Sequence, residues 1–332
     1  MKRWQVCVIV LLLAACAWTV VSYGRRDVDI VKRVPVSSPI PALQSVTLLF
    51  TGDIMLSRSV GDQMMALHNW QWPFERIASV TRAADLTFGN LETTISTRGA
   101  KRGCGYCFRA DPKAVEGLVR AGFDVLSVAN NHIWDYGPDA FTDTLRYLAV
   151  NDISVTGGGR NAVEARAPVV RTVRDTRIAY LAYTDILPAS AGALASRAGA
   201  NIWDEQRMKE DVARARSLAD VVVVSFHTGT EYEPLHNATQ ERIYHAIIDA
   251  GADLVVGTHP HVVQDVERYN GKWIAYSLGN FIFDQNFSDE TRKGLMLSVA
   301  VSGGHITDVS RIPVDISKDY QVTIHDSKTT IR

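Results

Sequence analysis

Residues 254–261 read LVVGTHPH, an apolar run followed by glycine, threonine and two histidines that flank Pro260. A short run rich in β-branched residues predicts a buried strand. Polar side chains directly after such a strand indicate a ligand site, because ligands bind at the carboxyl ends of strands in open α/β sheets. Residues i and i+2 of an extended segment project to the same side. Because a residue before proline favours extended backbone, we expect an extended His259, with His259 and His261 facing one pocket.

The same strand pattern recurs along the chain and predicts an α/β fold. Further buried strands are expected at Val46–Phe50, Leu86–Phe88, Val125–Val128, Ile178–Ala182, Val221–Phe226 and Trp273–Leu278. Amphipathic stretches between them predict helices at Pro112–Ala121, Pro138–Val150, Asp204–Leu218 and Ala238–Ala250. Antiparallel strands are expected at Leu295–Val301 and Thr307–Val314. The alternation predicts a mixed sheet, or a pair of sheets, flanked by helices.

Polar side chains follow most of these strands at the same end. They are Asp53, Asn90, Glu92, Asn130, Asn131, His132, His227, His259, His261 and Asn280. Any one of them alone is explained by a turn, a helix cap or a structural histidine. Together, carboxylates, carboxamides and imidazoles form the ligand set that Mn, Zn or Fe accepts. The combination therefore favours a site for a divalent metal, with one or two ions.

The N-terminus predicts export. Basic residues precede an apolar stretch from Trp4 to Val21, which is typical of a signal or membrane anchor within residues 1–24. The segment before Cys16 resembles a lipobox, in which Cys16 would be acylated, and the longer apolar run fits an uncleaved transmembrane anchor equally well. Both readings predict a membrane-tethered, extracytoplasmic protein of the cell envelope or periplasm. Residues 25–45, rich in proline and mixed charge, predict a linker before one domain at 46–332.

Composition and cysteine usage narrow the class of protein. A formal net charge of −1 with 21% charged residues gives no global reason to bind nucleic acid. Cys104 and Cys107 lie in GCGYC, and export to an oxidising compartment favours a disulfide between them over a zinc knuckle or a redox motif. Basic residues bracket this loop, where they form either a path for a polyanion or a solvated surface; they are Arg98, Lys101, Arg102 and Arg109.

Six ordered motifs resemble one known family. TGDIML (51–56), GNLETTI (89–95), NNHIWDYG (130–137), HTGTEY (227–232), GTHPHVVQ (257–264) and YSLGNFIFDQ (276–285) are similar to the bacterial CapA capsule-synthesis proteins, which are associated with poly-γ-glutamate. The resemblance covers about Val46 to Val314. The family's relation to calcineurin-like metallophosphoesterases implies a four-layer α/β/β/α sandwich with a two-metal site between the loop ends of the sheets.

The resemblance also implies roles for single residues. Asp53 matches the aspartate of the first strand, and Glu92 lies where the wider superfamily has its bridging carboxylate. His132 matches the catalytic histidine that protonates the leaving oxygen, with Asp135 spaced to orient it. The remaining implied metal ligands are Asn131, His227, His259 and His261. We expect a further set to support these ligands or to contact substrate, namely Asn90, Asn130, Glu231, Asn280 and Arg109.

The chain departs from the superfamily pattern at the first metal position. Met55 stands where the superfamily has a histidine, and thioether sulfur is a poor ligand for Mn or Zn. That position would keep Asp53, Glu92 and His261. The second position, with Glu92, Asn131, His227 and His259, is complete. We therefore expect one well-held ion, which weakens the transfer of two-metal phosphodiesterase chemistry to this chain.

Three functions follow as hypotheses. The first is a membrane-tethered component of poly-γ-glutamate or capsule synthesis or export, which binds the anionic polymer and other subunits of that machinery. The second is an extracytoplasmic metallohydrolase of phosphoesters or γ-glutamyl amides, in which His132 is the general acid. The third is a scaffold that the metal stabilises and that performs no chemistry.

Overall fold

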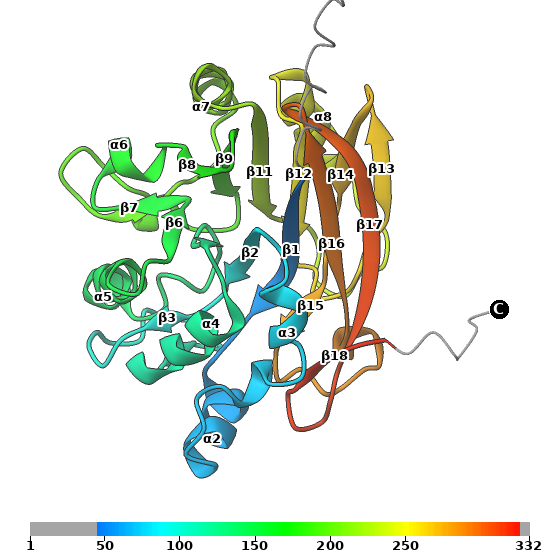
Figure 1. The fold of residues 1–332 in the computed structure, drawn as a ribbon. Helices are drawn as coiled ribbons and strands as arrows, with labels where there is room; N and C mark the ends of the chain where they lie inside the picture. Colours follow the sequence, from blue (N-terminus) through cyan, green and yellow to red (C-terminus); the bar gives the residue numbers. More distant parts are fainter. Residues whose placement is uncertain (1–44, 326–332) are drawn as a thin grey trace, which may run out of the picture. The chain divides into compact units, whose positions relative to one another are not determined.

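The computed structural model describes residues 45–325, all of which belong to one compact unit. Its largest sheet has a mixed strand order that begins and ends with short strands (Figure 1). The order is β18 (Val322–Ile324), β17 (His305–Ile316), β16 (Lys293–Ser302), β1 (Val46–Ile54), β2 (Leu86–Leu91), β5 (Val125–Ser127) and β6 (Ser154–Thr156). In addition, β15 (Asn280–Ile282) pairs with β1 in parallel.

The second sheet has parallel strands at its centre and an antiparallel strand at each edge. Its order is β13 (Val266–Tyr269), β14 (Lys272–Ala275), β12 (Leu254–Thr258), β11 (Val221–His227), β9 (Thr176–Thr184) and β8 (Val169–Val173). The remaining strands form two small two-stranded sheets. One pairs β3 (Thr94–Ile95) with β4 (Arg109–Ala110), and the other pairs β7 (Gly158–Gly159) with β10 (Gly199–Ala200).

Helices lie outside both sheets. They are α2 (Arg58–Ala66), α3 (Ala78–Thr81), α4 (Val115–Ala121), α5 (Gly137–Ala149), α6 (Ala162–Ala165), α7 (Glu205–Leu218) and α8 (Ala238–Asp249). Short 3₁₀ turns occur at Trp72–Phe74, Pro112–Ala114, Ala189–Ala191 and Glu290–Arg292. Helices α7 and α8 begin at side-chain caps: the Asp204 side chain accepts from the Arg207 amide, and Asn237 with Gln240 forms a capping box.

Three buried apolar clusters define four layers. One joins residues of both sheets, such as Phe50 of β1 and Val223 of β11, and forms the core between them. A second packs α4 and α5 against the outer face of the first sheet, and a third packs α7 and α8 against the outer face of the second. The expected four-layer α/β/β/α arrangement is confirmed, as are the antiparallel C-terminal strands.

The predicted strand Trp273–Leu278 is wrong in its extent. Strand β14 ends at Ala275, and the chain then leaves the second sheet and enters the first as β15 at Asn280. Gly279 makes this crossing with φ of 65°, a value that glycine adopts at little cost. Apolar content alone does not reveal such a switch, because both sheets bury these residues.

Strand register brings the predicted polar residues side by side. Asp53 of β1 pairs with Asn90 of β2 on one side and with Asn280 of β15 on the other. In the second sheet, His227 of β11 pairs with Thr258 of β12. The parallel registers therefore align the polar strand ends at one edge of each sheet, as the sequence predicted.

The segments expected to reach the membrane lie outside the described residues. These are the signal or anchor at 1–24 with Cys16, and the linker apart from its last residue. Within residues 45–325, no helix combines the length and apolarity needed to span a bilayer.

Arg98 of the basic loop has a structural partner. Its Nε and Nη2 donate to both carboxylate oxygens of Asp143 in α5, at 2.8 and 2.7 Å, and Asp143 is buried. The Ser96 hydroxyl donates to the same carboxylate. Arg98 therefore ties the cysteine loop to α5. Neither sequence interpretation, a polyanion path or a solvated surface, anticipated this, because the pairing joins positions 45 residues apart.

This ion pair predicts a pH-dependent stability. The hydrogen bonds from Arg98 lower the pKa of the Asp143 carboxyl below its usual value. A carboxyl whose folded pKa is depressed contributes stability above its unfolded pKa, about 3.9, and loses it as the pH falls through the folded value. We expect Asp143→Asn to lower the melting temperature at pH 7 and the difference from wild type to shrink below about pH 4. A difference that is constant from pH 3 to 7 in thermal melts would contradict this assignment.

Candidate functional site

The predicted ligands converge between the two sheets. The Asp53 Oδ1 and His227 Nδ1 atoms are 3.9 Å apart, and the His227 and His259 ring centroids are 4.9 Å apart. Glu92 Oε1 lies 3.8 Å from a ring nitrogen of each of His132, His227 and His261. All of these residues except His132 are buried, so five strand-end loops deliver their side chains to one water-poor centre.

Two overlapping groups of side chains could each hold a metal ion. One is Asp53, Glu92 and His227, and the other is Glu92, His259 and His261, with donor atoms within 4.8 Å of one another in each group. Glu92 belongs to both, as a bridging carboxylate would. The grouping differs from the sequence-based one, which placed Asp53 with His261 and His227 with His259. Asn131 does lie by His227, with Oδ1 2.8 Å from Nε2.

The donor set is suited to a cation. Both carboxylate oxygens of Glu92 and Nδ1 of His259 are buried and have no hydrogen-bond partner among the described residues. Burial, followed by the charge of Asp53, raises the pKa of Glu92 well above its usual value. Burial lowers the pKa of His227 well below its usual value and that of His259 to about 3, which leaves both imidazoles neutral. A buried carboxylate beside neutral imidazoles is the environment that a divalent metal stabilises.

The backbone at the two histidines is not extended, so that expectation is wrong. His259 has φ of 102° and His261 has φ of 59°. Such values cost on the order of 1–3 kcal/mol each in residues other than glycine and are found at functional sites. The turn lets the His259 amide donate to Asp53 Oδ2 at 3.2 Å while both rings reach the centre. Pro260 disfavours this backbone conformation at His259, and the hydrogen bond from the His259 amide to Asp53 favours it.

A chain of amides supports the ligands. Asn90 Nδ2 donates to Asp53 Oδ1 at 2.8 Å, and Asn130 Nδ2 donates to Asn90 Oδ1 at 3.1 Å. Asn280 Oδ1 lies 3.0 Å from His261 Nδ1. These three asparagines therefore contact the predicted ligands directly or through one another, and their supporting role stays a prediction. Thr258, whose Oγ1 is 2.9 Å from His227 Nδ1, was missed, although it stands in the quoted GTHPH motif.

The Met55 side chain contacts Ser57. Its sulfur accepts hydrogen bonds from the amide and hydroxyl of Ser57, at 3.2 and 3.1 Å. The side chain is fully buried. This contact engages the Met55 sulfur, and the incomplete first metal position expected from the sequence stays a prediction.

His132 lies at the edge of the centre, and Asp135 contacts the ring nitrogen that points away from Glu92. Its Nδ1 is 2.8 Å from Asp135 Oδ2, and its Nε2 faces Glu92. The Phe108 amide donates to the same Asp135 oxygen at 2.7 Å, and the Phe108 ring stacks on His132 with centroids 3.8 Å apart. Phe108 was not predicted, because the pattern of the cysteine loop gives no sign of what it packs against.

The cysteine loop thus braces His132. Cys104 and Cys107 lie with their Cα atoms 5.4 Å apart, a separation that a disulfide spans. Their oxidised state stays a prediction. Arg109 donates to the carbonyls of Arg98 and Gly99 and lies over the Tyr136 ring, 4.2 Å from its centroid. These contacts lie within the cysteine loop and its neighbours, and none of them links Arg109 to the candidate metal ligands.

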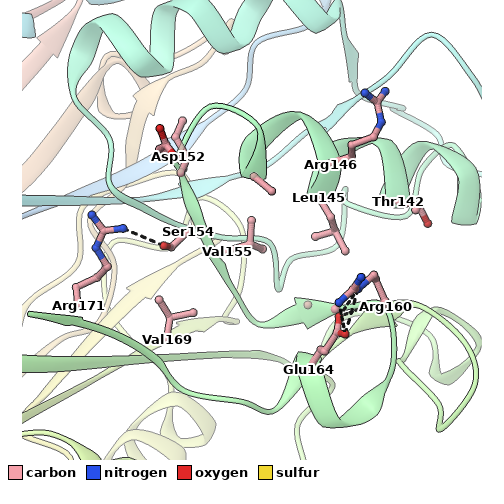
Figure 2. A pocket seen from close by; sticks show the side chains of 14 residues that line it. Thr142, Leu145, Arg146, Asp152, Ser154, Val155, Arg160, Glu164, Val169 and Arg171 are labelled. Carbon is pink, nitrogen blue, oxygen red and sulfur yellow. Dashed lines mark hydrogen bonds and ion pairs between the residues drawn. The ribbon is translucent and has the colours of Figure 1, made fainter.

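Two cavities contrast in size and position. A hollow of about 1060 Å³ lies between α5, α6, β6 and β8 and contains none of the predicted site residues. Its arginines are partly engaged: Arg160 pairs with Glu164, and Arg171 donates to Ser154 (Figure 2). A smaller pocket of about 210 Å³ has His132 and His261 in its wall and also includes Glu231. The smaller pocket therefore opens on the candidate metal centre.

Sequence comparison now places the chain. Residues 47–285 match the family described as "Bacterial capsule synthesis protein PGA_cap". The chain belongs to this family. The resemblance to CapA proteins that the motifs indicated is confirmed by individual relatives as well.

Three relatives of this PGA_cap member have informative names. Capsule biosynthesis protein CapA of Bacillus anthracis is 31% identical over 284 residues, which cover 83% of this chain and 68% of that protein. PGA biosynthesis protein CapA of Bacillus subtilis is 32% identical over 270 residues, with 80% and 70% covered. A probable polyglutamine synthesis accessory protein of Mycobacterium tuberculosis is 30% identical over 292 residues, with 81% and 76% covered.

Solved structures share the fold. A crystal structure described as a novel phosphatase of Mycoplasma pneumoniae has a TM-score of 0.53 at 14% identity, covering 82% of this chain and 94% of that one. A hypothetical protein of Thermus thermophilus has a TM-score of 0.52 at 16% identity, with 81% and 99% covered. At these identities the likeness shows a metallophosphoesterase-like fold and nothing about the substrate.

Proposed function

We propose that this PGA_cap member acts outside the cytoplasm, tethered to a membrane, in the synthesis or export of an anionic capsule polymer such as poly-γ-glutamate, and that it carries a divalent-metal hydrolase centre. The names of its relatives support the capsule role. The observation that carries the hydrolase role is the buried, unpartnered Glu92 carboxylate, shared by two groups of potential metal ligands. Other subunits of the capsule machinery are the expected protein partners.

Asp53, Glu92, His227, His259 and His261 would hold the ion. A bound Mn, Zn or Fe would serve as a Lewis acid at the scissile group. The chain itself contributes the positioning of the ligands by asparagines, the exclusion of water from the centre, and a proton donor.

His132 is the proposed proton donor. Its Nδ1 contacts Asp135, which fixes the ring, and its Nε2 faces the centre from the wall of the small pocket. In this arrangement a proton on Nε2 is placed to reach a leaving oxygen or nitrogen, while Asp135 stabilises the charged ring. Asp135 is thus a positioning residue for His132.

Two bonds are candidates for hydrolysis, a phosphoester and a γ-glutamyl amide. We would assay the purified full-length chain against γ-glutamyl oligomers and model phosphoesters, with Mn, Zn or Fe supplied separately. Metal-dependent release from either substrate class supports the hydrolase centre and selects the bond. Absence of turnover with every metal, in a chain that binds metal and supports polymer production, would favour a metal-stabilised scaffold instead.

The cysteine loop provides a further prediction about this centre. Because Phe108 and Asp135 link the loop to His132, breaking the disulfide is expected to loosen the proton donor rather than the metal ligands. Replacing both Cys104 and Cys107 with serine should lower kcat about 10-fold, within the ~100-fold that a 1 Å misplacement can cost. Thiol titration of the unreduced wild type should find no free thiol at these positions. An unchanged kcat would show that the bridge does not position His132.

A further inference from the structure

The small pocket beside the candidate metal centre has an aromatic rim. Tyr106, Tyr232 and Phe287 line it with side chains 74%, 42% and 66% exposed, and Tyr232 meets Phe287 edge to face with centroids 5.1 Å apart. Large aromatic side chains left open to solvent around a concave site are typical of ligand recognition. The inner wall of the pocket is formed by Phe108, His132 and His261.

The charges of the pocket favour a cation. Arg58, its one arginine or lysine, donates to both carboxylate oxygens of Asp284 through Nε and Nη2, at 3.0 and 2.7 Å. The Arg58 guanidinium also lies 5.1 Å from the Phe108 ring centroid and 5.6 Å from that of Tyr106. Glu231 lines the same pocket, is exposed, and has no cation within ion-pair distance among residues 45–325. Because Arg58 is paired with Asp284 and His132 with Asp135, Glu231 is the one carboxylate in the pocket lining that has no ion-pair partner among residues 45–325.

The pocket is tied to the metal ligands by hydrogen bonds. Gln285 Nε2 donates to the Tyr232 hydroxyl at 3.1 Å, and Asn280 Nδ2 donates to Gln285 Oε1 at 3.0 Å. Asn280 in turn contacts His261. The Tyr232 amide donates to the Pro260 carbonyl at 2.8 Å, between the two histidines. A ligand group held by Tyr232 is therefore held at a fixed position relative to the proposed centre.

We propose that this pocket binds an ammonium group of the substrate, so that the hydrolase centre acts on an ester or amide bond near a free amine. Aromatic rings attract cations through their faces, and a neighbouring carboxylate strengthens the preference. The inference rests on the proposed hydrolase function for the reaction, but the binding of an ammonium does not require the metal. A run of carboxylates is a poor occupant, because Glu231 repels it and Arg58 is already paired.

The inference also restricts how a γ-linked glutamate polymer would enter. Within such a chain every α-nitrogen belongs to a backbone amide, and a free ammonium occurs only at the amino terminus. An amine-binding pocket next to the centre therefore selects the chain end over the interior. A γ-glutamyl oligomer with a free amino terminus should be cleaved faster than its N-acetylated form.

Binding of tetramethylammonium to the full-length chain tests the pocket directly, with tert-butanol as the neutral probe of similar shape. Ligand-observed NMR titrations at constant ionic strength should show at least 10-fold tighter binding of the cation. Chelator-treated protein should bind it as well as metal-loaded protein. If the metal proposal is wrong, elemental analysis will find no bound ion. If the pocket proposal is wrong, the titration will show no preference for the cation.

Two variants make the test specific. Glu231→Gln and Tyr106→Ala should each weaken tetramethylammonium binding at least 5-fold. Glu116→Gln, which removes an acidic side chain of α4 outside the pocket, should bind like wild type. Thermal melts confirm that the variants fold, as the exposure of Glu231 and Tyr106 leads us to expect. Equal affinity for tert-butanol, or wild-type affinity in Glu231→Gln, would overturn the proposal.

Discussion

Replacing His132 with alanine is expected to slow hydrolysis by about 10²–10⁴-fold, the usual contribution of a general acid, and to leave the bound metal unchanged. His132 belongs to neither group of potential ligands, and its Nδ1 lies 2.8 Å from Asp135 Oδ2. The His132→Ala change therefore removes the proposed proton donor and leaves the carboxylates and imidazoles of the candidate centre in place. Steady-state kinetics and elemental analysis of the same preparation measure the two effects.

His245→Ala is the matched control for this experiment. His245 also pairs with a carboxylate, Glu267, and stacks on the Tyr269 ring, but it belongs to α8 and lines no part of the small pocket. Its kcat should stay within about 2-fold of wild type, because it lies outside the site. An unchanged kcat in His132→Ala, with metal retained, would show that another group donates the proton.

Replacing Glu92 with glutamine is expected to have the largest effect on metal binding. Glu92 belongs to both candidate ligand groups, so one substitution removes a carboxylate ligand from each group. Altering a partner of a ligand costs about 10–100-fold in metal affinity, so the loss of a shared ligand should exceed that range. A ligand at 100 times its Kd stabilises the folded state by about 2.7 kcal/mol. The rise in melting temperature that added metal gives to wild type should therefore vanish in Glu92→Gln.

Glu267→Gln controls for the loss of a carboxylate elsewhere. Glu267 accepts hydrogen bonds from His245 and Tyr276 and lies outside both ligand groups. Its variant should keep the metal-dependent rise in melting temperature, even if its own stability changes. Retention of that rise in Glu92→Gln would mean that the ion binds without the shared carboxylate.

The strand pattern predicted most of the fold and much of the site, for a physical reason. A buried strand needs an apolar run, and the residue that ends the run faces the sheet edge where ligands bind. Asp53, His227 and His259 could therefore be assigned to one site from their positions after such runs, and the structure brings them together. The resemblance to CapA proteins added His132 and its partner Asp135, which are in contact.

Features that depend on contacts distant in sequence could not be predicted. The switch of the chain from β14 to β15 depends on the packing of two sheets, and the turn at His259 depends on its amide reaching Asp53. The pairing of Arg98 with Asp143 and the stacking of Phe108 on His132 likewise join separate segments. Local pattern gives the residue type available at such positions but not its partner.

The metal content of the wild-type chain tests the central claim most directly. Purified full-length protein should be supplied with Mn, Zn and Fe, freed of excess metal by gel filtration, and measured by elemental analysis. We predict that the wild-type protein retains at least one divalent ion per chain and that His259→Ala retains far less. A wild-type chain that emerges metal-free from all three metals would contradict the account.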